Sequence, residues 1–166
     1  MKAIKKEILA CPNCKNAELT FCQSSHRMLC SLCNKEYDFS GDKFYFSEHT
    51  EDDITDFLDK VKHTFKKYRT LYKALIDIIS PVYTGNVGLK KFIKKHIAGK
   101  DVVALNLGSG NGDLHENISN VDLFRYDNVD VTADLLNLPI RDNAVDAIIN
   151  VAVLEHIPSP EKAVTA

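Results

Sequence analysis

The stretch DVVALNLGSGNG, residues 101–112, decides the fold predicted for this chain. Its first part is an apolar run typical of a buried strand, and Gly108, Gly110 and Gly112 follow at alternate positions. Such glycines let the backbone turn sharply and approach a ligand with no side chain in the way. A glycine-rich loop alone is a weak signal, but a strand before it and a polar turn after it favour a nucleotide-type cofactor site.

The segments that follow fit an α/β fold with such a site. Val121, Asp122 and Leu123 read as a short strand that ends in an acid, and an acid at that place can accept hydrogen bonds from ribose hydroxyls. Asp134 lies beside an apolar residue and can hold an adenine amino group and ring. Residues 147–151 form a second run of the buried-strand type.

Taken in order, residues from about 71 to 163 resemble the class I methyltransferases that use S-adenosylmethionine, close to methyltransferase type 11. The resemblance implies a Rossmann-like sheet, with the glycine loop on the methionine part of the cofactor. It also implies that Asn150 and Val151 line the methyl-donor side. The cofactor-binding residues expected are Asn106, Gly108, Ser109, Gly110, Gly112, Asp122, Asp134, Leu135, Asn150 and Val151. Glu155 and His156 are weak candidates for an acid–base pair, and their plainer interpretation is helix-start residues that pack the loop.

Three features depart from that family pattern. Asn106 stands where the family usually has an acid. The short spacing from Gly112 to Asp122 leaves the first helix a single turn or absent. The family sheet has seven strands, whereas the chain ends at Ala166, soon after the fourth. We therefore expect an incomplete sheet that lacks its C-terminal strands. Either the chain is a fragment, or the exposed fourth strand, residues 145–151, pairs with another copy or another chain.

Two Cys-x-x-Cys pairs near the N-terminus predict a structural zinc site. The 15 residues between the pairs (15–29) fit the spacing of a zinc ribbon, in which two knuckles complete a tetrahedron of thiolates. Such a site has no open coordination position, so it should stabilise the fold and not catalyse. Cys22 is expected to be a free thiol, and His26 is not needed as a ligand. The predicted ligands are Cys11, Cys14, Cys30 and Cys33.

Residues 7–47 resemble a small zinc-ribbon activator family that partners methyltransferases acting on tRNA, rRNA and release factors. The resemblance rests on the two patterns ILACPNCK, residues 8–15, and LCSLCNKEY, residues 29–37. We expect short strands at residues 18–22, 28–30, 36–39 and 44–46, with a turn at Gly41 and Asp42.

Charge divides the chain into three parts. Residues 1–59 hold 7 basic and 11 acidic residues, residues 60–100 hold 11 and 1, and residues 101–166 hold 3 and 11. Apolar spacing predicts helices over about 51–79 and 87–97 in the basic part. The expected units are a zinc ribbon at 1–48, a helical linker or cap at 49–100, and the N-terminal half of a Rossmann-like domain at 101–166. The lysines form either a solvated helix face or a surface for an anionic partner such as RNA.

The amino-acid composition excludes several classes of protein. An apolar fraction of 45% with 27% charged residues excludes wholesale disorder. No apolar run is long enough for a membrane span and no secretory signal is apparent, so we expect a cytoplasmic protein without a membrane partner. An odd count of 5 cysteines argues against a disulfide framework.

These patterns predict an S-adenosylmethionine-dependent methyltransferase with a structural zinc ribbon for substrate or partner docking. Its acceptor is open: RNA, protein or small molecule. An rRNA guanine methyltransferase with an N-terminal ribbon is one analogue, and a small-molecule or glycan methyltransferase fused to a ribbon is another. The main alternative is a truncated, non-catalytic binding or activator module that uses the ribbon and the basic helices. A nicotinamide-dependent enzyme would share the glycine loop but not the segments after it.

Overall fold

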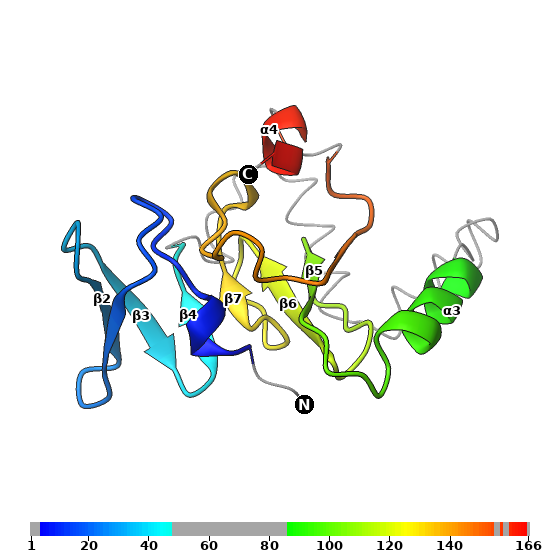
Figure 1. Cartoon of the computed structure of the whole chain (residues 1–166), viewed down its shortest axis with the longest axis horizontal. Coiled ribbons are helices and arrows are strands. Elements are labelled where there is room, and N and C mark those ends of the chain that lie inside the picture. The colour runs from blue at the N-terminus through cyan, green and yellow to red at the C-terminus, as the bar shows by residue number, and fades with distance from the viewer. Residues whose placement is uncertain (1–3, 48–85, 155–156, 158–159, 166) are drawn as a thin grey trace, which may run out of the picture.

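The computed structural model describes residues 4–47, 86–154, 157 and 160–165. The helix expected over 51–79 and the pair Glu155 and His156 lie outside these residues, so both stay predictions. Within the described part, one mixed sheet runs through the molecule in the order β1-β2-β3-β4-β7-β6-β5-β8 (Figure 1). The strands are β1 (Leu19–Cys22), β2 (Arg27–Cys30), β3 (Glu36–Ser40), β4 (Lys43–Tyr45), β5 (Ala104–Leu107), β6 (Ile118–Asp122), β7 (Val131–Thr132) and β8 (Ala147–Asn150).

Strands β1 to β4 form an antiparallel meander close to the bounds that the sequence predicts. Apolar residues alternate along these strands, so one face packs and the other is left to solvent. The packed face carries Phe21, Phe39 and Phe44, and the Phe21 ring meets the other two edge-on at centroid distances of 5.6 and 6.1 Å. Gly41 forms the β3–β4 turn at a φ of 59°, a left-handed conformation that glycine adopts without strain.

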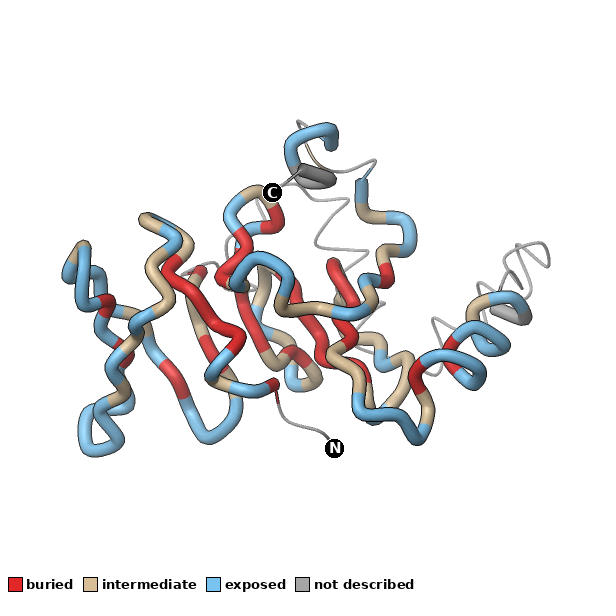
Figure 2. The backbone as a smooth tube through the Cα atoms, viewed as in Figure 1, coloured by how far each residue is buried: buried red, intermediate tan, exposed pale blue. Residues whose placement is uncertain are grey.

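Strands β5 to β8 form a parallel half-sheet, which is consistent with the Rossmann-like sheet that the sequence predicts. Its side chains alternate between two cores. On one face Leu105, Leu107 and Val121 pack with apolar residues of the N-terminal segment and the meander. On the other face Ala104, Ile118 and Ile149 pack against Ile93 and Ile97, which come from helix α3 (Asn86–His96) and the turn that follows it. Figure 2 shows buried residues along the strands of both halves.

The remaining elements are short. They are the 3-10 helices η1 (Lys6–Ile8) and η4 (Leu135–Asn137) and the C-terminal helix α4 (Pro160–Thr165). The segment between Gly112 and β6 contains no helix, in agreement with the short spacing, and β6 starts at Ile118, before the predicted strand start at Val121. Among the described residues, no helix combines the length and the apolar character that crossing a bilayer requires.

The two halves of the sheet meet where β4 pairs in parallel with β7, which the sequence did not predict. The amide of Phe44 donates to the carbonyl of Asp130 at 2.8 Å, and that of Phe46 donates to the carbonyl of Thr132 at 2.8 Å. The meander therefore covers one edge of the parallel half, although the proposed domain boundaries themselves stay a prediction. The opposite edge is β8, where the side chain of Ile148 is 58% exposed. Pairing of β8 with a second chain also stays a prediction.

Candidate metal centre and cofactor loop

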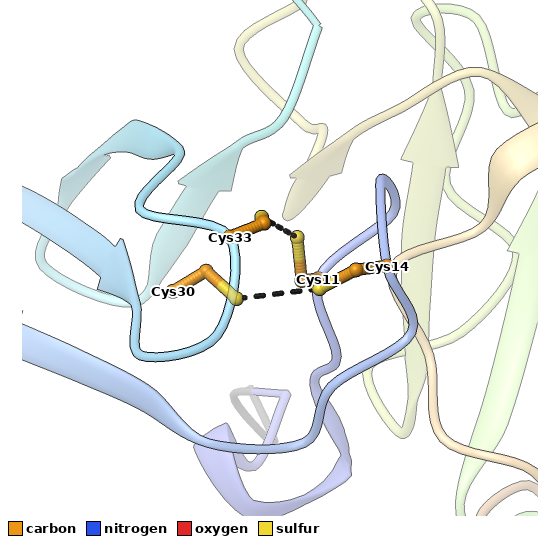
Figure 3. Close-up of side chains that lie close together, drawn as sticks. All are labelled: Cys11, Cys14, Cys30 and Cys33. Atoms are coloured by element: carbon orange, nitrogen blue, oxygen red, sulfur yellow. Dashed lines mark hydrogen bonds between the residues drawn. The ribbon is translucent and has the colours of Figure 1, made fainter.

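The four predicted cysteines converge on one point between the two knuckles (Figure 3). The Sγ atoms of Cys11 and Cys33 lie 3.6 Å apart, those of Cys14 and Cys30 lie 3.5 Å apart, and all four lie within 4.8 Å of one another. A zinc ion with Zn–S bonds of roughly 2.3 Å would place its sulfur ligands about 3.8 Å apart at the corners of a tetrahedron. All four thiols are free and none forms a disulfide. The donor set and its spacing thus fit a tetrathiolate zinc site.

The two knuckles repeat the same backbone pattern. The amide of Lys15 donates to the carbonyl of Cys11 at 2.8 Å, and the amide of Asn34 donates to the carbonyl of Cys30 at 3.0 Å. Lys15 and Asn34 follow the second cysteine of each pair, and both adopt left-handed backbone with φ of 59° and 56°. This repeat points the two sulfurs of each pair in one direction. Asparagine tolerates the conformation well, whereas lysine does so at a cost in free energy.

The groups around the sulfurs shift the pKa values of the cysteines in different directions. A backbone hydrogen bond from Asn16 lowers the pKa of Cys14, but burial and hydrogen bonds with the other three cysteines outweigh it and raise the pKa to about 12. The Tyr37 hydroxyl lies 3.2 Å from Cys11 Sγ. Burial and the neighbouring Cys11 raise the pKa of Tyr37, so its hydroxyl keeps its proton and can donate it to the sulfur. Burial raises the pKa of Cys30, but hydrogen bonds from the backbone of Cys33 and Leu32 outweigh it and lower the pKa to about 6. Sequence reasoning did not single out Tyr37, whose only signal is its place in the strand after the second knuckle.

The other two residues considered for this site lie elsewhere. Cys22 is exposed at the end of β1, and its Sγ lies 3.3 Å from the Ser24 hydroxyl. Hydrogen bonds from the Ser24 and Ser25 side chains lower the pKa of Cys22 to about 7. His26 is in the β1–β2 turn, with its ring 6.1 Å from that of Phe39. Within the described part of the chain, the four cysteines alone form a group suited to a metal ion.

The glycine loop leaves the carboxyl end of β5 and turns toward β6. Gly108 and Gly110 both have left-handed backbone, with φ of 68° and 54°. A Cβ atom at Gly108 would lie 2.3 Å from Val153 Cγ2, whereas a Cβ at Gly110 would meet no atom within 4 Å. The loop is therefore packed at its first glycine, whereas at its second the space that a side chain would occupy is open.

Asp122 closes the loop from the neighbouring strand. Its Oδ2 accepts a hydrogen bond of 2.7 Å from the amide of Gly110, and its Oδ1 accepts one of 3.0 Å from the amide of Phe124. The residue is 8% exposed at the carboxyl end of β6. A carboxylate has about four lone-pair sites, so two remain for further donors. The position and the acceptor capacity suit the predicted ribose contact.

Asn106 belongs to a network of amide side chains that reaches the carbonyls of the glycine loop. Its Nδ2 donates to Asn120 Oδ1 at 3.0 Å, and Asn120 Nδ2 donates to the carbonyl of Asn128 at 3.0 Å. Asn128 Nδ2 donates in turn to the carbonyls of Gly110 and Gly112 at 3.1 and 3.2 Å. Sequence reasoning missed both Asn120 and Asn128. The network gives Asn106 a structural partner, and its cofactor contact stays a prediction.

The other predicted cofactor residues are spread around the same sheet end. The Ser109 hydroxyl donates to the Gly110 carbonyl at 3.3 Å. The exposed Asp134 caps η4, where its Oδ1 accepts from the Leu136 amide at 2.9 Å. Leu135 is only 8% exposed and belongs to the core, so its side chain faces inward in this conformation. Asn150 ends β8 and Val151 follows it, with Val151 49% exposed. Their cofactor roles stay predictions.

A search of curated proteins finds no match to this chain. A family model described as a methyltransferase domain, however, matches residues 95–166, which contain the four parallel strands, the glycine loop and the C-terminal helix.

Proposed function

We propose that the chain is an S-adenosylmethionine-dependent methyltransferase with a structural zinc site in its N-terminal ribbon. One observation carries the proposal: an open glycine loop and an acid meet at the carboxyl ends of the adjacent parallel strands β5 and β6. Ligands of open α/β sheets bind at that end of the strands. The match of residues 95–166 to a methyltransferase domain supports the choice of cofactor.

When bound, the cofactor would supply an electrophilic methyl group for transfer to the acceptor, and its positively charged sulfur would leave as a neutral thioether. The residues of this chain would bind and orient the cofactor. The backbone at Gly110 would lie along the methionine part, Asp122 would accept from the ribose and Asp134 from the adenine amino group. Asn150 and Val151 would line the donor side. Such a reaction depends mainly on positioning and on excluding water, so it needs no catalytic dyad.

The zinc site would hold the ribbon together. Four thiolates complete the coordination of the ion, so no position is left for a substrate or a water molecule. Binding of the ion would also supply folding free energy to a ribbon whose own apolar core is small. We therefore assign zinc a structural role and the ribbon surface a docking role.

The surface of α3 favours an anionic acceptor such as RNA. Lys90, Lys91, Lys94 and Lys95 are exposed along α3, and none of them forms an ion pair with another described residue. Phe92 on the same helix is 42% exposed, with its ring 4.9 Å from that of His96. Clustered cations with an exposed ring suit a nucleic-acid backbone and its bases. Binding that weakens steeply as salt rises would support this surface, and binding that ignores salt would refute it.

Titration calorimetry of the zinc-loaded chain with S-adenosylmethionine tests the cofactor proposal. We expect a micromolar dissociation constant, on the order of 10 µM, as for typical small-ligand sites. Asp122→Asn keeps the size of the side chain but removes its charge, and it should weaken binding by at least about tenfold. Asp42→Asn is the matched control, because Asp42 is exposed in the β3–β4 turn. A wild-type chain that binds no cofactor would refute the proposal and favour the non-catalytic alternative.

A further inference from the structure

The first zinc knuckle is hydrogen-bonded to a segment more than a hundred residues further along the chain. The amide of Ala10 donates to the carbonyl of Pro139 at 2.9 Å, and the amide of Arg141 donates to the carbonyl of Ile8 at 2.8 Å. Lys15 Nζ, just after the second cysteine, donates to the carbonyl of Leu138 at 3.1 Å. The knuckle thus lies directly against residues 138–141.

Arg141 spans the knuckle from one flank to the other. Its Nε donates to the carbonyl of Leu9, before Cys11, at 3.2 Å. Its Nη2 donates to the carbonyl of Ala17, after Cys14, at 2.8 Å. The planar guanidinium holds its donors in a fixed fork, so one side chain can donate to both carbonyls at once. The backbone on both sides of the first cysteine pair is therefore tied to Arg141.

Residues 138–141 continue the segment assigned above to the adenine side of the cofactor. At its start, the amide of Ala133 donates to the carbonyl of Asp122 at 2.8 Å. Asp134 then caps η4, and the chain runs on to the knuckle contacts. One end of the segment is hydrogen-bonded to β6, the strand that carries Asp122, and the other end to the first cysteine knuckle. The conformation of the segment thus depends on β6 and on the knuckle.

We propose that the metal-loaded knuckle positions residues 134–141 through Arg141, so that the affinity for the cofactor depends on the metal. The proposal rests on the proposed function for its cofactor half. A knuckle of this kind gains its order from metal binding. Without that order, the carbonyls of Leu9 and Ala17 no longer hold fixed positions for the guanidinium. Arg141 is a positioning residue in this account, since it touches the knuckle and not the cofactor.

The experiment compares three zinc-loaded proteins: the wild type, Arg141→Ala and the control Arg27→Ala. Arg27 lies within the ribbon, in β2. It pairs with Glu36 at 2.7 Å and Asp38 at 3.7 Å, not with residues 138–141. Hydrogen exchange read by mass spectrometry reports the order of residues 134–141, and calorimetry reports the dissociation constant for S-adenosylmethionine. Wild-type protein freed of zinc by a chelator is measured alongside.

We expect Arg141→Ala to speed exchange at residues 134–141 and to weaken cofactor binding about tenfold, within the usual range of coupling between sites. Arg27→Ala should change neither, and the zinc-free wild type should resemble Arg141→Ala. If Arg141→Ala does not fold, Arg141→Lys keeps the charge but offers one contact, and it should give a smaller change in the same direction. Unchanged exchange and affinity in the Arg141 variant that folds would overturn the proposal. Altered exchange in a chain that binds no cofactor at all would refute the proposed function but not the positioning.

Discussion

Alanine at the two left-handed glycines of the cofactor loop should have clearly different effects on stability. Gly108 and Gly110 have similar φ values, 68° and 54°, so alanine pays the same backbone penalty at both, about 1–2 kcal/mol. Only Gly108 faces another side chain: a Cβ there would lie 2.3 Å from Val153 Cγ2 and 2.6 Å from Cγ1. Relieving such an overlap typically costs a further 1–3 kcal/mol, roughly. We therefore expect a loss of about 1–2 kcal/mol for Gly110→Ala and about 2–5 kcal/mol for Gly108→Ala.

Urea denaturation of the zinc-loaded protein, followed by far-ultraviolet circular dichroism, measures both losses. The double variant Gly108→Ala with Val153→Ala should lose less than the sum of the two single changes, because it removes both atoms that cause the overlap. Losses for Gly108→Ala and Gly110→Ala that agree within about 0.5 kcal/mol would refute the packing of Val153 on the loop.

Three further changes test the surroundings of the two sites. Asn106→Asp should lower stability by about 1–3 kcal/mol in the same denaturation assay, because it removes the donor to Asn120 and buries a charge, and an equal or greater stability would contradict the structural role. Tyr37→Phe should weaken zinc binding by about 10–100-fold in competition with a coloured chelator, because Cys11 loses its donor, and unchanged affinity would refute that contact. Alkylation of Cys22 in the zinc-loaded protein should speed up as pH rises through about 7, where the thiol loses its proton, and a midpoint near its ordinary value of about 8.5 would contradict the lowered pKa.

The strands and the metal cluster could be predicted because their signals are local. Alternating apolar residues mark β1 to β4, which pack one face, and a continuous apolar run marks β5, which buries both faces. A similar run marks β8, although Ile148 of this edge strand is 58% exposed. The Cys-x-x-Cys spacing likewise fixes two sulfurs on one knuckle. The short segment after Gly112 could be predicted to lack a full helix from its length alone.

Contacts between distant segments could not be predicted in this way. Nothing in residues 43–45 indicates that they pair with residues 131–132, because a backbone ladder is formed by groups that every residue carries. No sequence pattern singles out Arg141, because its contacts are to backbone carbonyls that the fold brings to it. Asn120 gave no signal either, since it lies within a strand that begins earlier than the apolar residues suggest.

The asparagine at position 106, where the resembled family usually has an acid, has a structural explanation. Because of this difference, Asn106 lacks the negative charge expected there. In the structure the amide is 5% exposed and donates to Asn120, which an ionised carboxylate could not do. The same network reaches the loop carbonyls through Asn128. The asparagine at position 106 is therefore explained by the support that it gives to the loop.

The most direct test of the central claim is a nuclear magnetic resonance titration of the ¹⁵N-labelled, zinc-loaded chain with S-adenosylmethionine. We expect saturable shifts of the amide resonances of Gly108, Gly110, Gly112 and Asp122. The amide of Gly41, another left-handed glycine but in the ribbon turn, should not move. The claim would be contradicted if the resonances of the glycine loop stay fixed at millimolar cofactor, a concentration at which even a very weak ligand binds.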